Sequence, residues 1–168
     1  MTRALQVLSR LAEVVSKTSA YLGSAAILCI MLATISDVAG RSIFGASVGG
    51  AVETAELLLV AAAFLGLGLA QRRRVHVSMA VVMNQFSPGP RRVFHLVGSA
   101  LLVAFAAWAC WVSSAAAWEA FVTGDYRFGL VNVPTWPARA CIGLGLLSLA
   151  FEELNRFASL AVGGSNGI

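Results

Sequence analysis

Four long runs of apolar residues make up most of the chain, and short polar or charged stretches separate them. A helix needs ~20 consecutive apolar residues to cross the hydrocarbon core of a bilayer. The runs therefore predict four membrane-spanning helices, at about residues 20–41, 48–70, 93–121 and 136–153. The fourth run ends at Glu152, Glu153 and Arg156. We expect an all-α integral membrane protein that forms a single membrane domain over residues 1–168.

Two further segments are amphipathic, or apolar but too short to cross a membrane. Residues 1–19 carry basic residues among leucines and valines at helical spacing, which predicts an amphipathic lead-in that lies on the membrane surface. A cleaved signal peptide has a similar pattern, but the small residues at 24–26 come too early in the apolar run to serve as its cleavage site. Residues 75–86 stand between basic residues and a Pro/Gly turn, so we expect a short interfacial helix there.

The composition supports the same class of protein. Hydrophobic residues make up 58% of the chain and charged residues only 12%, whereas a soluble domain has about 25% charged residues. The mean hydropathy is +0.81. The net charge of +4 comes from basic residues beside the apolar runs, without the aromatic–basic alternation of RNA or single-strand binding, so we expect no nucleic-acid partner. The three cysteines lie inside apolar runs without metal-ligand spacing.

The distribution of basic residues predicts the orientation of the spans. Most of them lie near the two ends of the chain and between the second and third predicted spans, which is one side of the membrane. Loops rich in Lys and Arg stay in the cytoplasm. We therefore expect both termini and the cytoplasmic interfacial segment at 75–86 to lie on the cytoplasmic side.

Charged residues gather where the first predicted span ends and the second begins. Asp37 precedes Arg41 by one helical turn, and Glu53 and Glu56 share a helix face. Each sign also suits the dipole of the helix end that carries it. Two interpretations stay open: the charges cap two helices at the membrane surface, or they form an ionic cluster that holds the helices, and a partner, in register.

Aromatic and charged residues mark the third and fourth predicted spans. Trp108, Trp111 and Trp118 fall on one helix face. Trp118 suits the aromatic belt of a membrane protein, whereas Trp108 and Trp111 lie deeper, and we expect them to pack on other helices. A polar hairpin is expected between the two spans, with Thr135 as the cap of the following helix. Arg139 lies inside the fourth span and must snorkel or pair.

The sequence carries no recognisable catalytic motif, and we expect neither enzyme activity nor a cofactor. His76 and His95 are the only histidines, and a haem between facing helices is the alternative to structural roles for both. A second alternative is a self-contained, proton-coupled carrier of the small multidrug type that works as a dimer. Glu53 or Glu56 would then be its membrane carboxylate, although both lie near the outer end of a span.

Three stretches in the same order carry a family resemblance over nearly the whole chain. They are residues 37–56, with the charges named above; residues 64–70, followed by basic residues and His76; and residues 132–137, with Pro134 and Trp136. In these stretches the chain resembles the small membrane (Q) subunit of tripartite ATP-independent periplasmic (TRAP) transporters. It departs from that family at residues 78–80, where Ser-Met-Ala replaces a frequent acidic residue after the histidine.

The resemblance implies a bacterial inner-membrane subunit without catalytic activity. Its partners would be a large (M) membrane subunit, which holds the substrate and sodium sites, and a periplasmic substrate-binding protein that delivers organic acids. The small subunit would act in the lipid bilayer as a scaffold for the large one. The candidates for partner-interface or structural roles are Asp37, Arg41, Glu53, Glu56, His76, Pro134, Trp136 and Arg139.

Overall fold

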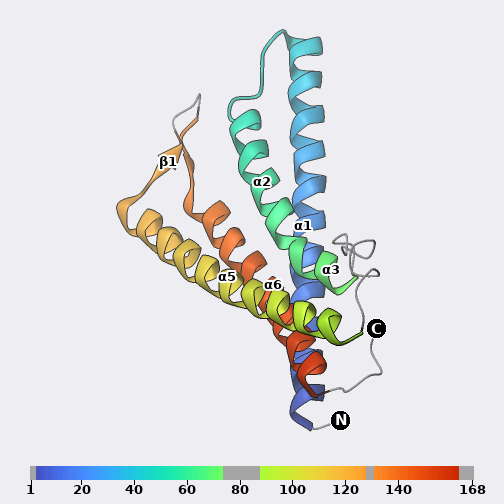
Figure 1. Cartoon of the computed structure of the whole chain (residues 1–168). Helices are drawn as coiled ribbons and strands as arrows, with labels where there is room; N and C mark the ends of the chain where they lie inside the picture. Colours follow the sequence, from blue (N-terminus) through green and yellow to red (C-terminus); the bar gives the residue numbers. More distant parts are fainter. Residues whose placement is uncertain (1–2, 74–87, 128–130, 163–168) are drawn as a thin grey trace.

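The computed structural model describes residues 3–73, 88–127 and 131–162, and this part of the chain is almost entirely helical (Figure 1). The helices are α1 (Arg3–Phe44), α2 (Ala51–Leu65), α3 (Leu67–Arg72), α5 (Pro88–Thr123) and α6 (Trp136–Val162). Two short strands, β1 (Tyr126–Arg127) and β2 (Val133–Pro134), pair antiparallel between α5 and α6. The predicted all-α class and the predicted hairpin are both confirmed.

Three helical segments are long and apolar enough to cross a membrane: Gln6–Phe44, Ala51–Arg72 and Leu96–Thr123. They correspond to the first three predicted spans. The fourth, α6, begins at Trp136 as expected, but its longest stretch free of Asp, Glu, Lys and Arg is residues 140–151. That stretch is shorter than the ~20 residues of an unaided span. The predicted interfacial helix at 75–86 and its His76 lie outside the described residues.

The first helix differs from the sequence-based expectation, because the predicted surface lead-in is not a separate element. It continues into the first span as one helix of 42 residues. At ~1.5 Å per residue this helix is about 63 Å long, roughly twice the thickness of a hydrocarbon core. Small residues spaced alternately four and three apart form its buried face: Ala12, Ser16, Ser19, Gly23 and Ala26. The lead-in therefore packs on the other helices of the chain instead of lying apart from them.

Helix α6 is the centre of the bundle, since it packs on α1, α2, α3 and α5, while α5 lies chiefly along α6 (Figure 1). Two glycines permit this close packing. A Cβ atom at Gly145 of α6 would collide with the backbone carbonyl of Phe64, and one at Gly68 would collide with Ser148. Small residues at such crossings let helices approach closely without relying on the hydrophobic effect.

The turns between the helices use glycine where the backbone is left-handed. Gly50 has φ 82° at the start of α2, and Gly124 has φ 66° between α5 and β1. A Cβ atom at Gly50 would also lie 3.1 Å from the Val131 side chain, so the hairpin rests on the start of α2. Thr135 precedes α6 and its carbonyl accepts the Arg139 backbone N–H at 3.3 Å, while its hydroxyl donates to the carbonyl of Asp125, 3.2 Å away.

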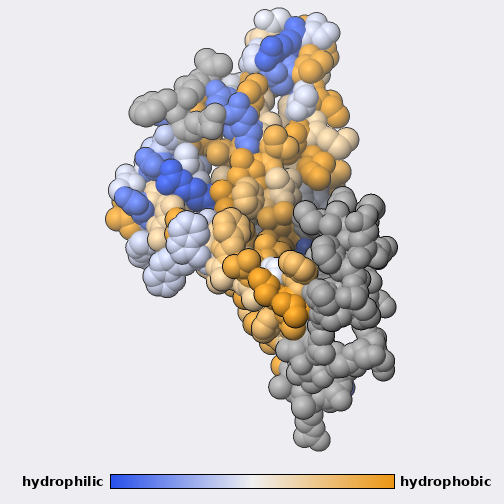
Figure 2. Space-filling view, in the orientation of Figure 1, coloured by the Kyte–Doolittle hydropathy of each residue, from blue (hydrophilic) through white to orange (hydrophobic). Residues whose placement is uncertain are grey.

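The distribution of polarity is the reverse of that in a soluble protein. The largest fully buried side chains in the described part are Glu153, Ser16 and Ser148, whereas large apolar side chains cover the outside. In Figure 2 apolar residues cover much of the visible face, and hydrophilic residues gather at the α1–α2 turn and around the hairpin. An exterior of this kind is stable in lipid and would aggregate in water. The chain is a membrane protein.

Candidate functional site: polar clusters at the two ends of the bundle

A buried carboxylate, Glu153 of α6, joins three helices at the end of the bundle where α1 begins. Its side chain has no exposed surface. Ser99 of α5 donates its hydroxyl to Glu153 Oε2 at 2.7 Å, and the Gln71 amide of α3 donates to Oε1. Arg156 Nη1, one turn further along α6, lies 3.3 Å from Oε1. Both oxygens of the carboxylate therefore accept hydrogen bonds from within the chain.

The neighbouring Glu152 extends this arrangement to α1. Ser16 donates its hydroxyl to Glu152 Oε1 at 2.7 Å, and Arg72 Nη1 lies 3.2 Å from the same oxygen. The other end of the Arg72 guanidinium pairs with Glu13 at 3.0 Å, and Glu13 also pairs with Lys17 at 2.7 Å. We call these contacting residues the Glu153 cluster: Glu13, Ser16, Lys17, Gln71, Arg72, Ser99, Glu152, Glu153 and Arg156.

The charges of the Glu153 cluster balance. Its three carboxylates, on Glu13, Glu152 and Glu153, are paired with three cations, on Lys17, Arg72 and Arg156. A buried charge without a partner costs several kcal/mol, and in a bilayer no water replaces the missing partner. Each carboxylate has a cation within 3.3 Å, so the attraction between the paired charges offsets the cost of burying them. What it provides is register between α1, α3, α5 and α6.

At the opposite end of the bundle, Asp37 closes the turn between α1 and α2. Its Oδ2 pairs with Arg41 at 2.7 Å, one helical turn away. Its Oδ1 accepts the Ser47 hydroxyl at 2.7 Å and the Val48 backbone N–H at 2.9 Å. Asp37 is only 8% exposed, whereas 58% of the Arg41 side chain is exposed. The Asp37 carboxylate thus stabilises the turn by accepting the backbone N–H of Val48. Arg41 pairs with the same carboxylate from the exposed side.

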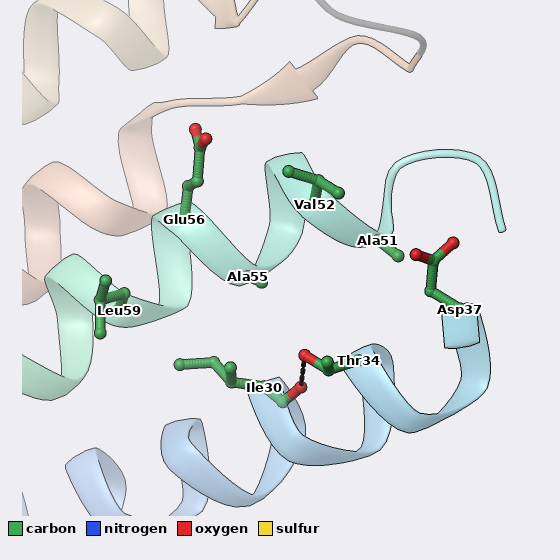
Figure 3. Close-up of a pocket in the computed structure, with 8 residues that line it drawn as sticks. All are labelled: Ile30, Thr34, Asp37, Ala51, Val52, Ala55, Glu56 and Leu59. Atoms are coloured by element: carbon green, nitrogen blue, oxygen red, sulfur yellow. Dashed lines mark hydrogen bonds between the residues drawn. The ribbon is translucent and has the colours of Figure 1, made fainter. Parts of the chain in front are cut away.

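Glu53 and Glu56 lie in the first two turns of α2, near Asp37 along the bundle. Glu56 and Asp37 both line a groove of about 290 Å³ between α1 and α2, whose other walls include Ile30 and Leu59. Figure 3 shows the Glu56 carboxylate pointing away from Asp37. Of the proposed ionic cluster, the Asp37–Arg41 pair is present as a salt bridge. A cluster of all four residues stays a prediction.

The remaining candidates hold the hairpin on the helix ends. Arg139 of α6 pairs with Asp125 at 3.3 Å and donates to the Ala116 carbonyl at 3.2 Å, so this arginine is paired, as the sequence requires. Trp136 packs its ring edge-on against Phe121, with the centroids 5.5 Å apart. Pro134 lies opposite Tyr126 in the two-stranded ladder.

The haem alternative gains no support from the structure. His76 lies outside the described residues, and so does the side chain of His95 in α5. Among the residues that the structure describes, no group of three or more His, Cys, Asp and Glu side chains is placed to hold a metal ion.

Sequence reasoning placed Glu152 and Glu153 at the end of the fourth span and gave them no role. Their partners Ser16 and Gln71 lie 136 and 82 residues away along the chain, so no local pattern reveals the contacts. The one signal present is the position of two adjacent acids within a largely apolar helix, since an ionisable residue inside a membrane segment has a specific partner or task.

Removal of the central carboxylate tests the Glu153 cluster. We predict that Glu153→Ala lowers the free energy of unfolding by about 3–5 kcal/mol, because it leaves Arg156, Gln71 and Ser99 without their acceptor. Equilibrium unfolding by a chemical denaturant in detergent measures this free energy, and the midpoint of the transition falls with it. The control is Glu119→Ala, on the exposed surface of α5, which we expect to shift the midpoint little. Equal shifts for the two variants would contradict the structural role of the cluster.

A second prediction concerns the turn between α1 and α2, at the opposite end of the bundle. Asp37→Ala removes acceptors from Ser47 and Val48, whereas Arg41→Ala removes only an exposed partner. We therefore expect Asp37→Ala to lower the midpoint of thermal unfolding by several degrees and Arg41→Ala to lower it much less. If the arginine variant is the less stable of the two, the ion pair and not the turn is the stabilising contact.

Comparison with known proteins places this architecture in a family. The family model described as tripartite ATP-independent periplasmic transporters, DctQ component, matches residues 30–163, from within α1 to the end of α6. A search of curated proteins found no match. The family consists of transporter components and not of enzymes. Since the match covers most of the chain and agrees with the sequence resemblance, the chain belongs to the family of DctQ components, the small membrane subunits of TRAP transporters.

Proposed function

We propose that this chain is the non-catalytic scaffold subunit of a sodium-coupled TRAP transporter. In this role it supports the large membrane subunit during the uptake of organic acids, which a periplasmic binding protein delivers. The family match supports the transporter context and the two kinds of partner. Sodium coupling, the scaffold role and the substrate class are part of the proposal.

The scaffold role is supported by one observation: the buried polar groups make contacts within the chain. Glu152, Glu153 and Asp37 are all bonded to groups of the same chain, and these bonds link helices or close a turn. A transport site requires polar groups that converge on a ligand-sized cavity. Two grooves among the described residues, one beside Ile30 and one beside Gly23, are instead lined mostly by apolar or small side chains. The chemistry of substrate and sodium binding then belongs to the large subunit.

A self-contained proton-coupled carrier does not fit this arrangement. Such a carrier needs a membrane-embedded carboxylate near the middle of the bilayer. Glu53 and Glu56 lie in the first two turns of α2, at the end of the bundle that carries the hairpin.

We further infer that α6 is the fourth membrane-spanning helix. The charges that make it too polar to span alone are bonded to the protein: Arg139 to Asp125, Glu152 to Ser16 and Arg72, and Glu153 to Ser99. Pairing inside the bundle lowers the cost of placing such groups at membrane depth. With four spans, the asymmetry of basic residues supports an orientation in which both termini and the Glu153 cluster lie at the cytoplasmic side of the bacterial inner membrane. The excess length of α1 then extends into the cytoplasm.

This topology can be tested with reporter fusions. A reporter that is active only in the periplasm should be inactive when fused after Ile168, and active when inserted in the hairpin between β1 and β2. The reason is the asymmetry of basic residues across the four spans. Activity at the C-terminus and none at the hairpin would refute the orientation, whereas the same result at both sites would refute the membrane-spanning role of α6.

The scaffold role is tested by reconstitution. We predict that liposomes holding only this chain show no sodium-driven uptake of organic acids, because its buried polar groups are committed to contacts between its own helices. Liposomes that also contain the large subunit, supplied with the binding protein, are the positive control. Uptake by this chain alone, at a rate near that of the full system, would contradict the proposal.

A further inference from the structure

One face of α5 carries a continuous row of large, exposed apolar side chains. Leu101, Phe105, Trp108, Trp111 and Trp118 all lie on it, each more than half exposed. Their successive spacings of four, three, three and seven residues place them within one side of the helix. We call this row the aromatic face of α5. The expectation that Trp108 and Trp111 pack on other helices is wrong for the helices of this chain.

The opposite side of α5 is already occupied. Small residues such as Ser99, Ala106 and Ala120 are buried there. Cys110 on the same side lies 3.4 Å from the Gly143 carbonyl of α6, and α5 packs chiefly along α6. The aromatic face is therefore presented outward from a helix that is fixed along its back, so little ordering is required when a partner binds it.

The depth of two tryptophans distinguishes this face from an ordinary lipid-facing surface. The candidate span of α5 is Leu96–Thr123, and Trp108 and Trp111 lie on either side of its midpoint. They are 65% and 77% exposed. Tryptophan in membrane proteins is concentrated at the water interface, where the indole N–H finds a partner. Trp118, nearer the hairpin end of α5, is placed for that role.

Hydrocarbon offers the two central indoles no acceptor. An indole N–H is a donor only, and a donor without a partner in the bilayer core is costly. Within the described residues, neither the Trp108 nor the Trp111 indole N–H donates a hydrogen bond, and the aromatic ring that Trp108 contacts, Phe105, lies on its own helix. The exposed middle of α1 is different, since Leu28, Met31 and Leu32 have no N–H or O–H group in their side chains. Lipid suits that face of α1 and does not satisfy the aromatic face of α5.

We propose that the aromatic face of α5 is the surface on which the large membrane subunit docks. Trp108 and Trp111 pack against one of its membrane-spanning helices and donate their indole N–H groups to backbone carbonyl or hydroxyl oxygens of that helix. This assignment rests on the proposed function, because it takes the large subunit as the partner. It adds which surface of the chain makes the contact and which chemistry the partner must offer at mid-membrane depth.

The test replaces the indoles without removing the apolar surface. In the Trp108→Phe, Trp111→Phe double variant both N–H donors are lost and aromatic rings remain. The matched control is Trp118→Phe on the same face. Interhelical hydrogen bonds in membranes are individually modest, so we expect the double variant to retain roughly tenfold less large subunit in co-purification from mild detergent, and the control to retain the wild-type amount.

The possible results distinguish failure of the proposed function from failure of the docking surface. If the wild-type chain itself fails to retain the large subunit, the proposed function is wrong. If the wild type retains it and the double variant retains it equally well, the scaffold role stands and the docking surface is overturned.

A second measurement does not depend on how the double variant folds. A photo-reactive amino acid placed at position 111 should form a covalent adduct with the large subunit in the membrane, and the same probe at Leu28 of α1 should not. An adduct from position 28 without one from 111, or only lipid adducts at 111, would overturn the docking surface.

Discussion

The arrangement of the helices depends on one fully buried carboxylate. Glu153 has no exposed surface, and it accepts hydrogen bonds from α3 and α5 and from Arg156 on its own helix. In a bilayer the hydrophobic effect does little to draw helices together, because lipid tails are as apolar as the side chains. A polar contact between helices is therefore specific: only one register of α3, α5 and α6 satisfies the acceptor. Glu152 extends the same constraint to α1 through Ser16 and Arg72.

The other features of the structure follow from the burial of polar side chains between the helices. The helices approach closely at small residues, such as Gly145 against the Phe64 carbonyl, and their large apolar side chains are directed outward. Such a protein has polar groups for internal registration and apolar faces for lipid and for other proteins. Those properties suit the proposed scaffold role, in which a partner carries out the chemistry of transport. The aromatic face of α5 carries two exposed indoles near the midpoint of its candidate span, and lipid offers their N–H groups no acceptor.

Much of the fold could be predicted from hydropathy, because a membrane-spanning helix is a long local pattern. The first three spans and the hairpin lie where the sequence places them, and the Asp37–Arg41 pair follows from a spacing of one helical turn. The Glu153 cluster could not be predicted, because its bonds join residues as far apart as Ser16 and Glu152. The lead-in was mistaken for a surface helix because basic residues on an amphipathic segment suggest a headgroup contact. In the fold its small residues pack inward and Glu13 pairs with Arg72.

The Glu153 cluster should hold α1 and α5 at one fixed separation, although these two helices meet chiefly through α6. Spin labels at Leu11 of α1 and Leu101 of α5, two exposed positions, measure that separation by pulsed electron spin resonance in lipid bilayers, after the three native cysteines are replaced. We predict a single, narrow distance distribution that becomes broad when Glu153→Ala is introduced. A broad distribution in the parent chain, or a narrow one that the substitution leaves unchanged, would contradict the account.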